Sequence, residues 1–125
     1  MRIIARYIGT MIVAFAIIFP VQKIAVASDY YLCAYGNGSY YVVTETVSPT
    51  EAAASYAYEA KVKFVPANYP SEYRLLDATI LYKNNQWLIL RWDSSSGWKT
   101  SRVTYDYDYS GYLKDYIVNT YNIRV

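Results

Sequence analysis

The sequence contains no histidine, the side chain that most often acts as a general base near neutral pH and most often ligates zinc. No hydrolase triad that relies on histidine can therefore be written for this chain. Glycine is also scarce, since the five glycines are isolated or lie in turn-like segments and none builds a phosphate-binding loop. We predict a protein that is not an enzyme, with no catalytic residue, no cofactor and no metal ion.

Cysteine is nearly absent, because Cys33 is the only one. One thiol cannot close a disulfide within the chain, so the stability of the fold must come from its apolar core. We interpret Cys33 as a small apolar residue buried in a strand, and an intermolecular disulfide is the alternative.

Long apolar runs are missing except near the N-terminus. Met1–Arg6 carries two arginines, Tyr7–Phe19 is uncharged, and Ala25-Val26-Ala27 has the spacing of small residues that a signal peptidase accepts. We predict a signal peptide over residues 1–27 and cleavage before Ser28. An uncleaved membrane-tethered form is the alternative, although the apolar run is short for a membrane span.

An excess of positive charge is missing from the predicted mature chain. Removal of 27 of the 125 residues leaves 98, which suits one domain over residues 28–125. Three of the twelve basic residues leave with the signal peptide, so nine face ten acidic residues and the net charge is −1. This balance excludes a nucleic-acid partner and gives the mature form no attraction to a membrane. We expect a periplasmic, cell-surface or secreted protein.

The densest apolar surface lies in two runs, Leu75–Tyr82 and Trp87–Trp92, which predict a β-hairpin. A two-residue loop at Asn84-Asn85 would pair Ala78 with Arg91 and mix polar with apolar partners. We prefer a three-residue loop beginning at Lys83, because it separates polarity between the two faces. The pairs are then Ile80 with Leu88, Ala78 with Leu90, Leu76 with Trp92 and, on the other face, Asp77 with Arg91.

Further strands are predicted on both sides of this hairpin. Tyr30–Tyr35 and Tyr40–Val47 flank a Gly-rich turn, and Tyr56–Val65 alternates between apolar and polar residues over its whole length. We confine any helix between these strands to about one turn near Pro49–Ser55. Trp98–Tyr105 predicts another strand.

The C-terminal segment carries a helical stripe made of Leu113, Tyr116, Ile117, Thr120 and Tyr121. The fold class that follows is mainly β (α+β), with five to six antiparallel strands in meander or hairpin order and a short C-terminal helix.

Tyrosine is abundant, and sixteen of the seventeen lie beyond the predicted signal peptide. Tyrosine rings can cover sheet faces or form a contact surface for a protein or glycan ligand. We single out Trp98, Tyr107 and Tyr109 as candidate ligand-binding residues. The segment Asp106–Gly111 also copies the first half of a calcium loop, but position twelve is Ile117 rather than glutamate, so we favour an acidic turn.

The opening of the mature chain, D-Y-Y-L-C-A-Y-G-N-G-S-Y-Y-V-V-T-E-T-V (Asp29–Val47), resembles small bacterial surface-adhesin protein E-like domains. The strand with A-K-V-K-F and the hairpin I-L-Y-K-N-N-Q-W-L-I-L follow in the same order as in that family. The resemblance implies an antiparallel sheet domain at the cell envelope. Members usually carry a cysteine near the position of Tyr82 and a second near the C-terminus, and this chain has neither.

We therefore expect an exported, non-enzymatic binding or structural domain that presents a Tyr/Trp-rich sheet surface. The alternative is a small exported inhibitor or enzyme. Ser96-Gly97-Trp98-Lys99 matches the S-x-x-K pattern of acyl-enzyme nucleophiles, but it lies in a serine-rich turn rather than at a helix start.

Overall fold

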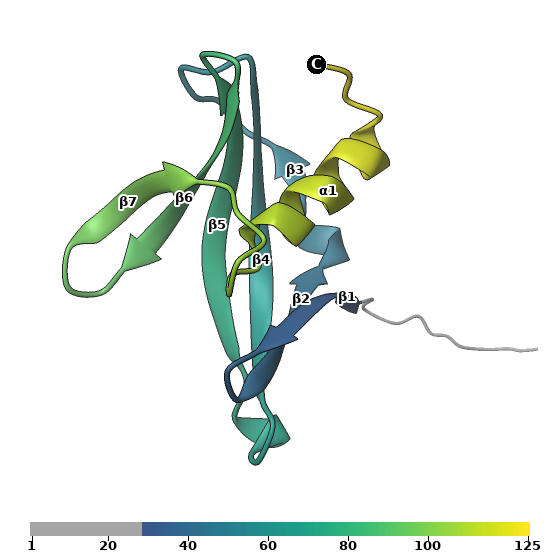
Figure 1. The fold of residues 1–125 in the computed structure, drawn as a ribbon, viewed down its shortest axis with the longest axis vertical. Helices are drawn as coiled ribbons and strands as arrows, with labels where there is room; N and C mark the ends of the chain where they lie inside the picture. Colours follow the sequence, from purple (N-terminus) through teal and green to yellow (C-terminus); the bar gives the residue numbers. More distant parts are fainter. Residues whose placement is uncertain (1–28) are drawn as a thin grey trace, which may run out of the picture.

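The computed structural model describes residues 29–125, so the predicted signal peptide and the alternative membrane tether lie outside the described residues. The described chain forms an antiparallel sheet with a C-terminal helix across one face (Figure 1). The strand order is β1-β2-β4-β5-β6-β7, and the two-residue strand β3 pairs with β4 off this path. The predicted fold class, a mainly β (α+β) fold in meander order with a short C-terminal helix, is confirmed.

The strands are β1 (Asp29–Tyr35), β2 (Gly38–Val43), β3 (Ser48–Pro49), β4 (Tyr56–Pro66), β5 (Arg74–Lys83), β6 (Gln86–Asp93) and β7 (Gly97–Arg102), and the helix α1 spans Ser110–Tyr121. Two 3-10 turns, η1 (Thr44–Thr46) and η2 (Pro70–Glu72), lie between strands. Between Asp29 and Val125, no helix is both long and apolar enough to span a membrane.

The helical turn expected near Pro49–Ser55 does not form. Ser48 and Pro49 instead pair with β4, and the Thr50 N–H donates to the Ala57 carbonyl at 2.9 Å. Ala52, Ala53 and Ala54 have high helix propensity, but three residues are too few to form a helix alone, because helix nucleation is costly without a face to pack.

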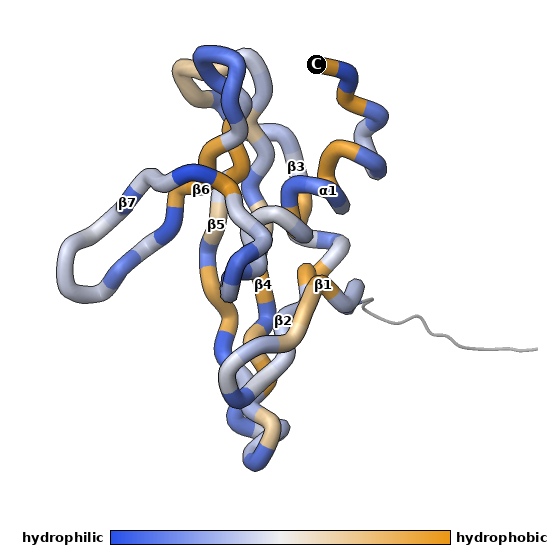
Figure 2. Tube along the Cα trace, viewed as in Figure 1, coloured by the Kyte–Doolittle hydropathy of each residue, from blue (hydrophilic) through white to orange (hydrophobic). Residues whose placement is uncertain are grey.

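The core lies between the sheet and α1. Register places Val42 against Val62 and Ile80 against Ile89, and all four are fully buried. Figure 2 shows the apolar residues gathered on the central strands and on part of α1. The buried core cluster comprises Leu32, Val42, Ala60, Val62, Ala78, Ile80, Ile89, Tyr109, Leu113, Ile117 and Ile123. The strand predicted from alternation in residues 56–65 is thus confirmed, with its apolar face inward.

Helix α1 packs through the predicted stripe. Leu113 and Ile117 are fully buried, one turn apart on the sheet side. The helix ends at Asn122, whose left-handed backbone (φ 52°) lets its N–H bond the Val118 carbonyl.

The register expected for the central hairpin is wrong. The structure has the two-residue loop, with φ of 53° at Asn84 and 62° at Asn85, and it pairs Ala78 with Arg91. Two asparagines suit such a turn because asparagine tolerates the left-handed region. Arg91 consequently lies on the inner face, where it meets Asp108, and Asp77 pairs with Lys61 across the sheet instead of with Arg91.

Several tyrosines pack as ring pairs within the fold. Tyr40 stacks on Tyr35 at 4.7 Å and on Tyr109 at 5.2 Å between ring centroids. Cys33 is half-buried in β1, and its thiol donates weakly to the Asp108 carbonyl at 3.9 Å. Burial, and then the charge of Asp108, raises the pKa of this thiol. The interpretation of Cys33 as a packing residue in a strand is consistent with this position.

Candidate binding groove

Trp98 lies on the β6–β7 hairpin, which projects from the part of the sheet that α1 covers (Figure 1). It is directly opposite Trp92, and the two rings meet edge to face with centroids 5.6 Å apart. Both rings are about half exposed, at 52% and 56%. Each ring therefore keeps the other in place while much of both remains open to a ligand.

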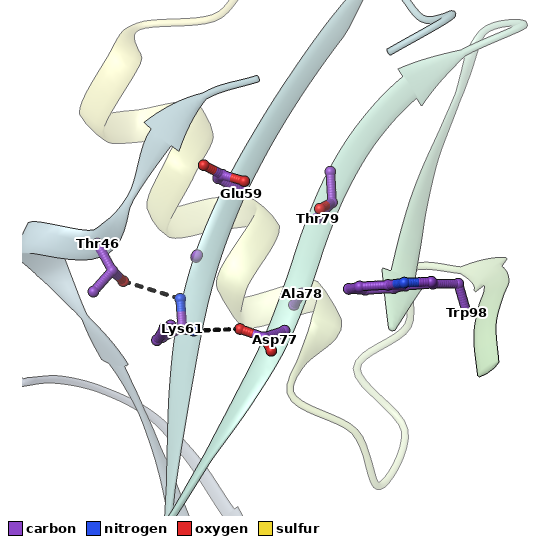
Figure 3. Close-up of a pocket in the computed structure, with 8 residues that line it drawn as sticks. Thr46, Glu59, Lys61, Asp77, Ala78, Thr79 and Trp98 are labelled. Carbon is purple, nitrogen blue, oxygen red and sulfur yellow. Dashed lines mark hydrogen bonds and ion pairs between the residues drawn. The ribbon is translucent and has the colours of Figure 1, made fainter. Parts of the chain in front are cut away.

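Trp98 forms one wall of a groove on the sheet face opposite α1 (Figure 3). The groove has a volume of about 310 Å³. Its lining residues are Thr46, Glu59, Ala60, Lys61, Asp77, Ala78, Thr79 and Trp98. The side chains of Ala60 and Ala78 belong to the core, so the strands offer their backbone there as a flat floor.

The polar groups along the groove are fixed by an ion pair and by hydrogen bonds. Lys61 forms an ion pair with Asp77 on the neighbouring strand, and its backbone N–H donates to the Thr46 hydroxyl at 2.9 Å. The Ser48 hydroxyl donates to Glu59 at 3.5 Å. Because strands β4 and β5 fix the spacing of these groups, the groove is ordered before a ligand arrives. Two carboxylates and one ammonium group leave it with a slight negative charge.

The three residues singled out from the sequence do not form one site. Trp98 lines the groove, whereas Tyr107 lies on the loop before α1, where its side chain is 87% exposed. Tyr109 is 3% exposed and belongs to the core, so the structure contradicts its placement in a contact surface. Burial is the main reason that the pKa of Tyr109 rises to about 12, against a partial lowering by Arg91.

The segment that resembled half of a calcium loop folds around Arg91 instead. Asp108 accepts from Arg91 Nη1 at 2.7 Å, from the Ser110 hydroxyl at 2.8 Å and from the Tyr109 N–H at 2.8 Å. Within residues 29–125 no three acidic or cysteine side chains are grouped as metal ligands would be. This network fastens the β6–β7 hairpin to the start of α1, and so it positions Trp98.

Sequence reasoning missed the polar lining of the groove. The alternation in residues 56–65 does place Glu59 and Lys61 on the wet face of β4. The contribution of Asp77 and Thr79 depends on the register between β4 and β5, which pairs Lys61 with Asp77 and Glu59 with Thr79. The loop between these strands spans residues 67–73 and is too long for a tight hairpin turn, so its sequence does not set the register.

Comparison of the chain with protein-family models, with curated proteins and with solved structures finds no match in any of the three. The resemblance to surface-adhesin protein E-like domains therefore stays a prediction.

Proposed function

We propose that this protein is an exported, non-enzymatic binding domain, and that the groove beside Trp98 holds a glycan. One observation carries the proposal: a half-exposed tryptophan ring forms a wall of a groove whose other groups donate or accept hydrogen bonds. A pyranose ring presents C–H groups on its faces and hydroxyl groups around its rim. An aromatic wall beside fixed polar groups suits both parts of such a ligand.

The charges in the groove restrict the kind of glycan. Glu59 and Asp77 accept hydrogen bonds from hydroxyl or ammonium groups, and they repel carboxylate or sulfate groups. Lys61 is already paired with Asp77 and leaves no free cation among the lining side chains. The groove therefore favours neutral sugars or amino sugars over acidic polysaccharides.

Binding suits the groove better than bond cleavage does. Both carboxylates are already engaged, Glu59 by Ser48 and Asp77 by Lys61, and half of the Asp77 side chain is exposed. The groove is open to solvent along the sheet, whereas glycoside hydrolysis requires a pair of carboxyl groups that enclose the scissile bond. The predicted signal peptide agrees with a ligand outside the cell or in its envelope.

The test is binding of soluble oligomers of β-linked glucose, N-acetylglucosamine and glucosamine, followed by intrinsic tryptophan fluorescence and calorimetry. Trp98→Ala should weaken binding about tenfold or more, equivalent to ~1.4 kcal/mol. Tyr107→Ala is the matched control, because it removes an even more exposed ring outside the groove. Asp77→Asn should weaken binding of amino sugars more than that of neutral sugars.

Three results would contradict this proposal. If none of the oligomers binds and a protein ligand is captured instead, the site is a protein contact; if oligomers bind equally well to Trp98→Ala, the groove is not the site. Release of shortened oligomers during incubation would contradict the non-enzymatic assignment. Intact-mass measurement of the protein recovered from the periplasm or medium tests export separately, because processed material starts at Ser28.

A further inference from the structure

Strand β7 is an open edge of the sheet. It pairs with β6 on one side only, and no described strand lies along its other side. All of its residues from Trp98 to Arg102 are exposed. An edge of this kind presents unpaired N–H and C=O groups to any strand that can lie beside it.

The register identifies which backbone groups are unpaired. The Val103 N–H donates to the Trp87 carbonyl at 3.2 Å, so these two residues form a hydrogen-bonded pair of the ladder. Hydrogen-bonded and non-hydrogen-bonded pairs alternate in an antiparallel ladder. Lys99 and Ser101 therefore bond inward to β6. The backbone groups of Trp98, Thr100 and Arg102 point outward and have no described partner.

We propose that β7 pairs antiparallel with β7 of a second copy of the chain, with the two-fold axis at Thr100. In this register Thr100 faces its own counterpart, and Trp98 faces Arg102 of the second copy. All three outward-pointing residues of each strand then exchange both of their backbone hydrogen bonds. A shift of two residues in either direction leaves one residue of each strand unpaired.

The side chains favour the same register. Trp98 lies opposite Arg102 of the second copy, and a guanidinium group beside an indole ring is a favourable cation–π pair. Lys99 lies opposite Ser101 of the second copy, so no like charges meet. The shift that centres the pairing on Lys99 would set two lysines directly opposite each other, which is destabilising. The strand is thus complementary to itself at a single register.

The other edge of the sheet is unsuited to the same role. The pairing of β1 with β2 shifts at Leu32, between Tyr31 and Cys33, which marks a bulge in that edge strand. A bulge bends and twists an edge and hinders further pairing. The two-fold dimer is therefore favoured over an open head-to-tail assembly, in which β7 of one copy would pair with β1 of the next.

The pairing also sets the two grooves on one face of the dimer. A two-fold axis perpendicular to the sheet keeps the Trp98 faces of both copies on the same side. Arg102 of the second copy then lies beside the Trp98 ring that forms the groove wall. This inference does not depend on what the groove binds, because it is derived from the backbone and the register of β7.

The test is the mass of the full chain, in the form recovered from the cell, by size-exclusion chromatography with light scattering over a concentration series. We expect a monomer–dimer equilibrium. Thr100→Pro removes an outward N–H and leaves the bonds to β6 intact, so it should abolish the dimer. Thr100→Val keeps the N–H and the β-branched shape, and it should leave the dimer unchanged. Unchanged circular dichroism from the Trp92–Trp98 ring pair shows that the hairpin is still folded.

A cross-link identifies the register. In a Cys33→Ala background, Thr100→Cys should form an intermolecular disulfide under mild oxidation, because each Thr100 faces its counterpart across the axis. Asn119→Cys is the control for random collision. A monomer at every concentration would overturn the proposal. So would a dimer that persists in Thr100→Pro, or assembly that grows beyond two copies.

Discussion

Arg91 Nη1 lies 2.7 Å from Asp108 Oδ1, which joins the projecting hairpin to the loop before α1. The Asp108 side chain is 10% exposed and that of Arg91 is 32% exposed, so this pair is partly shielded from water. The guanidinium group also lies over the Tyr109 ring, 5.4 Å from its centroid. A cation on the inner face of the sheet is thus satisfied by groups from two neighbouring positions on the chain, Asp108 and Tyr109.

Asp108→Ala should destabilise the protein by about 3 kcal/mol, because it leaves Arg91 without its counter-ion and removes two further hydrogen bonds. Urea unfolding followed by tryptophan fluorescence measures this cost. Asp106→Ala is the matched control, since it removes an exposed carboxylate from the same loop and should change the stability by less than about 0.5 kcal/mol. Equal costs for the two variants would show that the ion pair does not hold the loop.

Alkaline pH should destabilise the fold through Tyr109. Its pKa is about 12 when folded and 10.0 in its ordinary range, so the unfolded chain ionises first as the pH rises. The contribution of protonated Tyr109 to the free energy of unfolding is complete below pH 10. It is lost between pH 10 and 12, which lowers the free energy of unfolding by about 2–3 kcal/mol. Urea unfolding at stepped pH should show this loss, and Tyr109→Phe should reduce it. Tyr35 adds to the effect, because burial also raises its pKa.

The turn between β5 and β6 should respond to changes at Asn85. Its φ of 62° lies in the left-handed region, which glycine adopts without strain. Asn85→Gly should stabilise the protein by ~0.5 kcal/mol, and Asn85→Val should cost about 1–2 kcal/mol. Thermal unfolding of the two variants is the measurement. The opposite order would mean that the loop has a different conformation in solution.

Gly38→Ala should be more damaging than Gly36→Ala. A Cβ at Gly38 would overlap the Phe64 ring and lie 2.7 Å from the Val65 carbonyl oxygen, which belongs to the paired strand and cannot move aside. We expect a loss of about 2–3 kcal/mol. Gly36 has open space around it but a φ of 63°, so its substitution should cost about 1 kcal/mol. Urea unfolding of both variants, with Ser39→Ala as a reference in the same strand, checks the order.

Local patterns predicted most of the elements correctly. The alternation from Tyr56 to Val65 indicated β4 and its faces, and the spacing of Leu113 and Ile117 indicated α1. These signals depend only on neighbours in the sequence, which is why they can be read without a structure. The Gly-rich turn before Ser39 likewise located the β1–β2 hairpin.

Register and long-range partners could not be predicted in the same way. The expected loop at Lys83 assumed that polar residues avoid the inner face, but Arg91 lies there because Asp108 is its partner. That partner is 17 positions away in the sequence. The groove could not be predicted for the same reason, because Asp77 and Lys61 meet only through the pairing of β4 with β5. Trp98 could be singled out because its exposure follows from its place beside a turn.

Helix α1 contacts β1 and also the segment between η1 and β3. The rings of Tyr30 and Tyr116 lie 4.8 Å apart, and Tyr121 donates a hydrogen bond to the Val47 carbonyl at 3.2 Å. During synthesis, the ribosome must release the residues of α1 before these contacts can close. The strands of the sheet therefore wait for α1 before their apolar face is covered, so packing of the core is a late, long-range step of folding.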